Sequence, residues 1–167
     1  DRRQRQMCIR DSISAMATKM AQCLRNDTVD PPVIPTMYKN KIMEGAKEPF
    51  FLLSIIDMTQ ENGMTTSAWR VYRMKVEYHL EETDYDRHSE YRDMGERLLG
   101  ILRTIDLPDK YKGDKIITRL VKANKMSFQI VENVLQFFVN YKIKVKLILP
   151  DPVKMQELEI NRLEVDE

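Results

Sequence analysis

The chain has few of the residues on which small secreted proteins and many enzymes depend. Its 167 residues include 2 cysteines, 5 glycines and 2 histidines. Two cysteines, Cys8 and Cys23, cannot make a disulfide framework, which favours a reducing compartment. The glycines are scattered, so no glycine-rich loop is predicted to cradle a phosphate. Neither His79 nor His88 lies in a motif that would position a nucleophile. We therefore predict that the protein is not an enzyme and needs no cofactor.

Long apolar runs and a strong charge of one sign are also missing. No stretch approaches the roughly 20 consecutive apolar residues that span a bilayer, and the charged first residues do not resemble a secretory signal. The formal net charge is +1, which does not indicate nucleic-acid binding. We expect a soluble single-domain protein with no membrane partner, located in the cytoplasm or in a particle assembled there.

One group of residues has the chemistry of metal ligands: Asp84, Asp86, His88 and Glu90. Their spacing matches neither a calcium loop nor a zinc site. The segment also lies at a predicted helix start, where acidic side chains stabilise the helix dipole without a ligand. We predict that this group binds no metal.

The two ends of the chain are predicted to lie outside the folded domain. Gln6 to Asp11 look like the translation of a transposase adapter used in sequencing-library preparation. Residues 1–12 are therefore predicted to be artefactual or disordered, the alternative being a genuine basic N-terminal arm. Residues 13–150 are predicted to form one domain, and residues 151–167 a charged C-terminal tail.

Two segments show the apolar spacing of amphipathic helices. The first follows a cap at Asp11 or Ser12, and a polar, proline-rich loop from Asp27 to Pro35 ends it. The second follows a cap at Asp86 and is expected to end at Pro108 and Gly113. The stripe of the first comprises Ile13, Met16, Ala17, Met20 and Leu24; that of the second comprises Tyr91, Met94, Leu98, Ile101, Leu102 and Ile105.

The remaining segments are typical of β-strands. Residues 69–81 and 135–147 alternate apolar and polar side chains, which predicts strands with one buried face. Shorter strands are expected at 37–43, 50–56, 116–121 and 126–131, with that at 50–56 buried on both faces. Glu132-Asn133 suits a tight turn. This order predicts an α+β fold, a mostly antiparallel sheet with two amphipathic helices packed on it.

The polar face of residues 135–147 supplies the candidate interaction residues. Lys142, Lys144 and Lys146 share this face, where they either attract phosphates or prevent the aggregation of an edge strand. We favour the second interpretation because no aromatic, glycine or arginine residues are interleaved with them. Phe138 and Trp69 also lie on polar faces, which indicates subunit contacts.

Several segments, in the same order, resemble the tail-terminator family of phages and prophages of Gram-positive bacteria. They are the first helix at 14–20, the KEPFF-like run at 44–51, the alternating strand through Tyr78, the FFVNY-like run at 134–141 and the segment 155–159. The similarity covers nearly all of the chain after Ser12. The chain departs from the family in Glu132-Asn133, which replaces an Asp-Gly-type turn, and in its proline-rich loop.

The resemblance implies a structural virion protein that forms a ring, expected to be a homo-hexamer, on the head-proximal end of the tail tube. Such a ring stops tube growth and docks head-completion proteins, so its partners would be itself, the major tail tube protein and a neck protein. DNA would pass through the lumen only as cargo. The lysines would then line the lumen or pair with acidic groups of a neighbour. Alternatives are a head-closure protein, the tube protein itself, or a small nucleic-acid-binding module.

Overall fold

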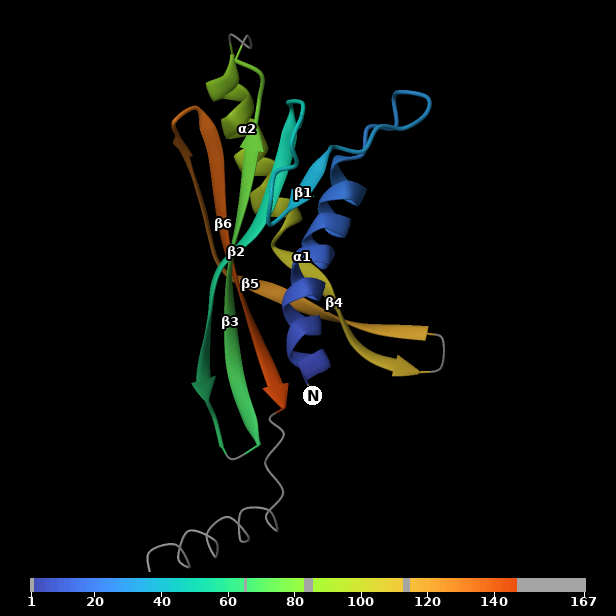
Figure 1. Cartoon of the computed structure of the whole chain (residues 1–167), viewed down its shortest axis with the longest axis vertical. Coiled ribbons are helices and arrows are strands. Elements are labelled where there is room, and N and C mark those ends of the chain that lie inside the picture. Colours follow the sequence, from blue (N-terminus) through green and yellow to red (C-terminus); the bar gives the residue numbers. More distant parts are fainter. Residues whose placement is uncertain (1, 65, 83–85, 113–114, 147–167) are drawn as a thin grey trace, which may run out of the picture.

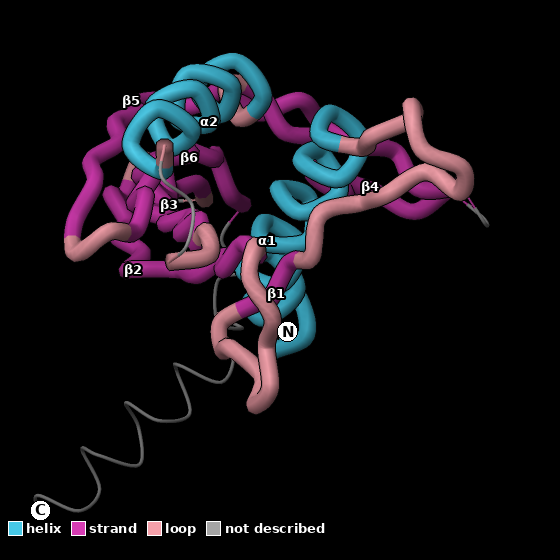
Figure 2. The backbone as a smooth tube through the Cα atoms, turned by 90° about the horizontal axis from the view of Figure 1, so that it is seen from above, coloured by secondary structure: helices cyan, strands magenta, loops and turns pink. Residues whose placement is uncertain are grey.

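The computed structural model describes residues 2–64, 66–82, 86–112 and 115–146. Six strands form one curled sheet in the order β1-β2-β3-β6-β5-β4, and two helices pack against its concave face (Figures 1 and 2). The only parallel pair among the described strands is β1–β2. The α+β class predicted from the sequence is confirmed. None of the described helices combines the length and hydropathy needed to cross a membrane.

Helix α1, Arg2–Leu24, lies against β4 and β2. All five residues of its predicted apolar stripe are buried, which confirms the face assigned from the sequence. The predicted cap at Asp11 or Ser12 is wrong, because the helix begins at Arg2 and Ser12 is fully buried within it. The origin of residues 1–12 in a sequencing adapter stays a prediction.

The centre of the sheet consists of β2, Phe50–Asn62, β3, Ser67–His79, and β6, Val134–Lys146. Strand β3 is paired along its length with β2 on one side and β6 on the other. The alternation in the sequence correctly predicts which side chains of β3 and β6 enter the core: Tyr72, Met74, Val76, Leu135, Phe137, Val139, Tyr141 and Ile143. The first four residues of β2 are buried on both faces, but the burial predicted for 50–56 does not reach Ile56, which is 48% exposed.

The region after the second helix differs from the prediction. Helix α2, Arg87–Ile101, ends before Leu102, and β4, Thr104–Lys112, follows almost at once. Leu102 and Ile105 fitted the helical spacing by coincidence, since Ile105 and Leu107 alternate with polar neighbours as in a strand. Pro108 does not end a helix but lies inside β4. An edge strand tolerates a proline, and the register shifts immediately after it, between Pro108 and Lys110. Gly113 lies outside the described residues.

The two short strands predicted at 116–121 and 126–131 are a single strand, β5, Lys115–Val131. Its first half pairs with β4 and its second half with β6, and the register shifts between Ala123 and Lys125, where the strand changes partner. The polar residues at this junction therefore mark a bend rather than a loop. The result is a β4–β5 arm that projects from the body of the protein (Figure 1).

The turns and the start of α2 agree with the prediction better than the boundaries of the strands do. Glu132 and Asn133 both have positive φ, 51° and 60°, as a two-residue hairpin turn between antiparallel strands requires. The predicted strand at 37–43 is shorter, since β1 spans Met37–Lys39 and Asn40 has a φ of 63°. Gly45 has a φ of 79°, which a glycine adopts without strain. Asp86 occupies the predicted N-cap position of α2.

Tyr91 connects α2 to two separate parts of the chain. Its hydroxyl accepts a hydrogen bond from the Leu80 amide at 3.1 Å and donates one to the Asn133 carbonyl at 2.7 Å. We expect Tyr91→Phe to lower the free energy of unfolding by about 1–3 kcal/mol, because the buried Leu80 amide and the Asn133 carbonyl both lose their partner. Urea denaturation measures this. The control Tyr38→Phe, at a partly exposed tyrosine, is expected to change stability by about 0.5 kcal/mol or less.

Candidate functional site

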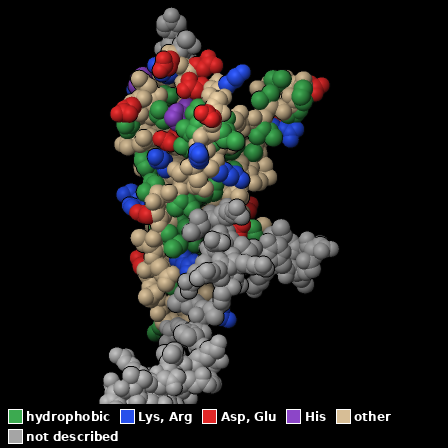
Figure 3. Space-filling model, viewed as in Figure 1, with side chains coloured by type: hydrophobic (Ala, Val, Ile, Leu, Met, Phe, Trp, Pro, Cys, Tyr) green, Lys and Arg blue, Asp and Glu red, His purple; other side chains and the backbone are tan. Residues whose placement is uncertain are grey.

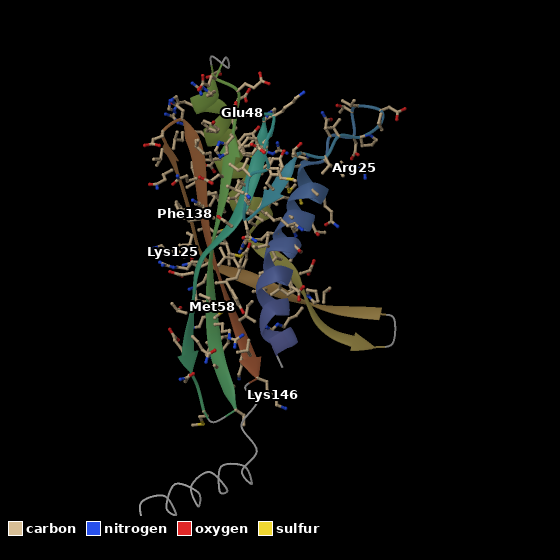
Figure 4. The ribbon with its side chains drawn as sticks, in the orientation of Figure 1. Arg25, Glu48, Met58, Lys125, Phe138 and Lys146 are labelled. Atoms are coloured by element: carbon tan, nitrogen blue, oxygen red, sulfur yellow. The ribbon has the colours of Figure 1, made fainter. Side chains whose placement is uncertain are left out.

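The sheet has one face that the helices do not cover, which we call the open face. It carries the outward side chains of β3 and β6 together with those of β2 and β5. Because paired residues of neighbouring strands point to the same side, the register assigns to this face Glu61, Trp69, Val71, Arg73, Lys75, Phe138, Lys142, Lys144 and Lys146, and Lys125 of β5. Figure 4 shows Phe138 and Lys125 on the side of the sheet away from α1.

Trp69 and two of the predicted lysines form one cluster on the open face. The ammonium nitrogens of Lys142 and Lys144 lie 5.4 Å and 5.9 Å from the centroid of the Trp69 ring, within the range of cation–π attraction. Trp69 is 40% exposed, so the ring and both cations remain accessible. Lys146 lies opposite Ser67 at the end of β6 and is exposed. The structure thus brings four of the five predicted residues to one end of the open face.

Phe138 lies apart from this cluster. It pairs with Lys75 of β3 and Ser127 of β5 and is partly buried. Six residues of extended strand separate it from Lys144, which corresponds to about 20 Å. Phe138 and the Trp69–lysine cluster are therefore two separate contact candidates on the same face.

Acidic residues of β2 lie beside the basic cluster. The Lys142 ammonium is 3.6 Å from the Glu61 carboxylate. Further along the strands, the Arg73 Nε donates to Asp57 Oδ1 at 2.6 Å, and a terminal nitrogen of Arg73 contacts the other carboxylate oxygen. These hydrogen bonds hold the pKa of Asp57 below its usual value. Both pairs are exposed to solvent, so they contribute to the charge pattern of the face more than to stability.

Sequence reasoning missed Asp57 and Glu61 because it ended the second strand at Ile56. The segment Asp57–Asn62 has no regular alternation of apolar residues, so periodicity could not reveal it. A different signal was available. Residues 69–81 were predicted as a long strand, and the polar segment Asn62–Ser67 before it suits a hairpin turn. A hairpin partner of similar length would have extended the second strand to that turn.

Two features of the described residues bear on chemistry, the arrangement of possible metal ligands and a pocket. No group of three or more histidine, cysteine, aspartate or glutamate side chains is arranged there to hold a metal ion, and Asp84 lies outside the described residues. A pocket of about 200 Å³ beside α1 and β2 is lined mainly by apolar residues, with Arg97 as its charged group. Its lining has no carboxylate, histidine or cysteine, the groups most often used in acid–base chemistry.

The loop between α1 and β1 exposes a second type of surface. An antiparallel bridge between Asn26 and Val33 closes this proline-rich loop. Val29, Val33 and Ile34 are exposed on it, and Figure 3 shows apolar side chains gathered on this projection. An apolar group on a projecting loop is typical of a site for contact with another protein.

Comparison with protein families adds the decisive observation. A family model described as phage tail terminator protein matches residues 31–151. The match covers all six strands and α2, and it leaves α1 outside. The chain belongs to this family. Tail terminators are structural proteins of the virion tail, so the resemblance described above is confirmed for residues 31–151 and a role in the phage tail is established. The resemblance of segments 14–20 and 155–159 stays a prediction. No curated protein matches the chain.

Proposed function

We propose that this tail terminator caps the tail tube as a ring, stops its polymerisation and presents a docking surface for head-completion proteins. The observation that carries the proposal is the family match over residues 31–151, which spans the whole sheet. The ring would lie at the head-proximal end of the tail and would assemble in the cytoplasm of the host bacterium. We expect a homo-hexamer with no catalytic activity and no cofactor.

The surfaces of the subunit support this proposal. A closed ring needs two different contact surfaces on each subunit, because each copy touches its two neighbours through different sides. It needs further surfaces for the tube below and the neck above. The open face lies on the side of the sheet away from α1, whereas the β4–β5 arm and the apolar loop between α1 and β1 both project on the other side, at different heights (Figures 1 and 2). A small subunit with several separate contact candidates suits such an assembly.

The charge of the open face suits the passage of DNA or contact with a neighbour. Lys125, Lys142, Lys144 and Lys146 are exposed on it, and Lys142 and Lys144 lie near Trp69. In the proposed ring this face is directed toward the lumen, where DNA passes as cargo without sequence-specific recognition. The same lysines are close enough to the end of β6 to meet acidic groups of the next subunit.

Co-expression of the full chain with the tube protein from the same phage cluster tests termination. Tube lengths and tube ends are scored by electron microscopy. We expect shortened tubes that carry a ring at one end. Unaltered tubes without a bound ring would argue for a head-closure protein instead, and polymerisation of the chain alone into long tubes would identify it as a tube protein.

A further inference from the structure

The end of the β2–β3 hairpin has a free strand edge. On the side away from β3, strand β2 is paired with β1 only at Phe51, Leu52 and Leu53. The register of β2 shifts between Ile55 and Asp57, and from Asp57 to Asn62 no described strand lies on that side. The backbone amides and carbonyls of this edge are therefore available for pairing with another strand.

Two of the features that usually protect a strand from pairing are missing from this edge. Lysine, proline or a covering helix commonly does so, but the sequence from Asp57 to Asn62 contains neither lysine nor proline. The edge strand on the opposite side of the sheet, β4, does contain a proline, Pro108, and like β2 it has a register shift. Ile56 and Met58, at the start of the free edge, are 48% and 39% exposed. The β2 edge is thus better suited to receive a strand than the β4 edge.

A second free edge lies at the end of β6, and its three lysines disfavour pairing with a like-charged strand but not with the acidic edge of β2. Strand β5 pairs with β6 only as far as Tyr141, so from Lys142 to Lys146 no described strand lies on the side away from β3. Arg119 of β5 reaches the Lys144 carbonyl there, with both terminal nitrogens at 3.4 Å. Contacts of this length are weak hydrogen bonds, which an incoming strand can replace.

The charges of the two edges match. On the open face, β2 presents Asp57, Thr59 and Glu61, while β6 presents Lys142, Lys144 and Lys146 at the same two-residue spacing. Both strands run antiparallel to β3, so they run in the same direction. In a ring with rotational symmetry, β2 of one copy would therefore meet β6 of the next as a parallel pair. Parallel pairing can place Asp57 beside Lys142 and Glu61 beside Lys146 on one face.

We propose that neighbouring subunits join by parallel pairing of Asp57–Asn62 of β2 in one copy with Lys142–Lys146 of β6 in the next. Thr59 then lies beside Lys144, and the sheets of adjacent subunits become continuous. The acidic and basic side chains fix the register and the direction of the contact. The contact is heterologous and closes into a ring. This inference rests on the proposed ring and specifies how its subunits meet.

Disulfide trapping tests the register directly. The variant carries Cys8→Ser and Cys23→Ser to remove the native thiols, with Thr59→Cys and Lys144→Cys. Within one chain β3 separates these two strands by about 9.5 Å, which exceeds the roughly 7 Å limit for a disulfide. In adjacent subunits the two Cα atoms would lie about 5 Å apart. After mild oxidation of the chain assembled on tail tubes, we expect a non-reducing gel to show a ladder from two chains up to the full ring.

Two controls make the result specific. Thr59→Cys combined with Lys125→Cys places the second thiol on the open face but away from the free edge, and should give no ladder. Thr59→Cys alone should remain monomeric, and a covalent dimer of this variant would indicate pairing of two β2 edges and overturn the proposal.

The outcomes separate this inference from the proposed function. Capped tubes without a ladder would overturn the strand pairing and leave termination intact. A ladder formed by concentrated protein that caps no tubes would support the strand pairing and contradict termination. The absence of both capping and a ladder would overturn both.

Discussion

Phe137→Ala is expected to lower the free energy of unfolding by about 3–5 kcal/mol, the usual cost of removing a fully buried phenylalanine. The side chain of Phe137 is completely buried in the central strand of the sheet. It pairs with Val76 on β3 and with Phe128 on β5, and the cavity left by the ring would lie between these strands and the helices. Urea denaturation followed by circular dichroism measures the loss.

Phe138→Ala is the matched control, because it removes the same ring from the next residue on the opposite face. Phe138 is partly buried on the open face, so we expect a loss of only about 1 kcal/mol. Its larger effect should be on tube capping, if Phe138 contacts another subunit. Equal losses of stability at the two positions would contradict the assignment of the faces of β6.

Replacement of Lys142, Lys144 and Lys146 together by glutamate is expected to weaken ring assembly on the tube on the order of a hundredfold, since like charges facing each other across an interface are strongly disfavoured. The new carboxylates would face Asp57 and Glu61 of the neighbouring subunit. The monomer should keep its fold, because all three lysines are exposed. Capping is measured by titrating the variant into growing tubes and scoring their lengths.

Charge reversal on the opposing edge is the control for this variant. Adding Glu61→Lys to the triple variant restores an opposite pair and should recover part of the capping activity, whereas Glu61→Lys alone should weaken it. Normal capping with a loss of infectivity would instead place the lysines on the path of the DNA. Unchanged capping and unchanged infectivity would exclude both roles.

The sequence was sufficient to predict those helices and strands that bury one face, because their apolar residues recur at regular spacing. In β3 and β6 every second side chain enters the core, and this local alternation correctly predicted both strands and the orientation of Phe137 and Phe138. The stripe of α1 was equally clear, since Met16 and Met20 lie one turn apart and both are fully buried. A helix or strand that is buried on one side has apolar residues at regular spacing, whichever elements it packs against.

Elements determined by distant partners were not predicted correctly. Strand β5 is continuous because β4 and β6 pair with different halves of it, which no local pattern reveals. The boundary between α2 and β4 was misplaced because Leu102 and Ile105 fit both helical and strand spacing. The candidate site was predicted only in part. The face of the lysines follows from alternation, but their proximity to Trp69 depends on the pairing of β3 with β6, in which Trp69 meets Lys144, more than 70 residues later in the chain.

The position of β6 has a consequence for synthesis of the protein. It is the last described strand in the chain, yet it lies between β3 and β5 in the sheet. Strand β3 must therefore wait for residues 134–146 before its second edge is paired, and such non-local pairing slows folding. Until then the nascent chain exposes Tyr72, Met74 and Val76, and exposed apolar strands promote aggregation. The yield of folded subunit should consequently depend on how quickly the ribosome completes β6, even when the finished protein is stable.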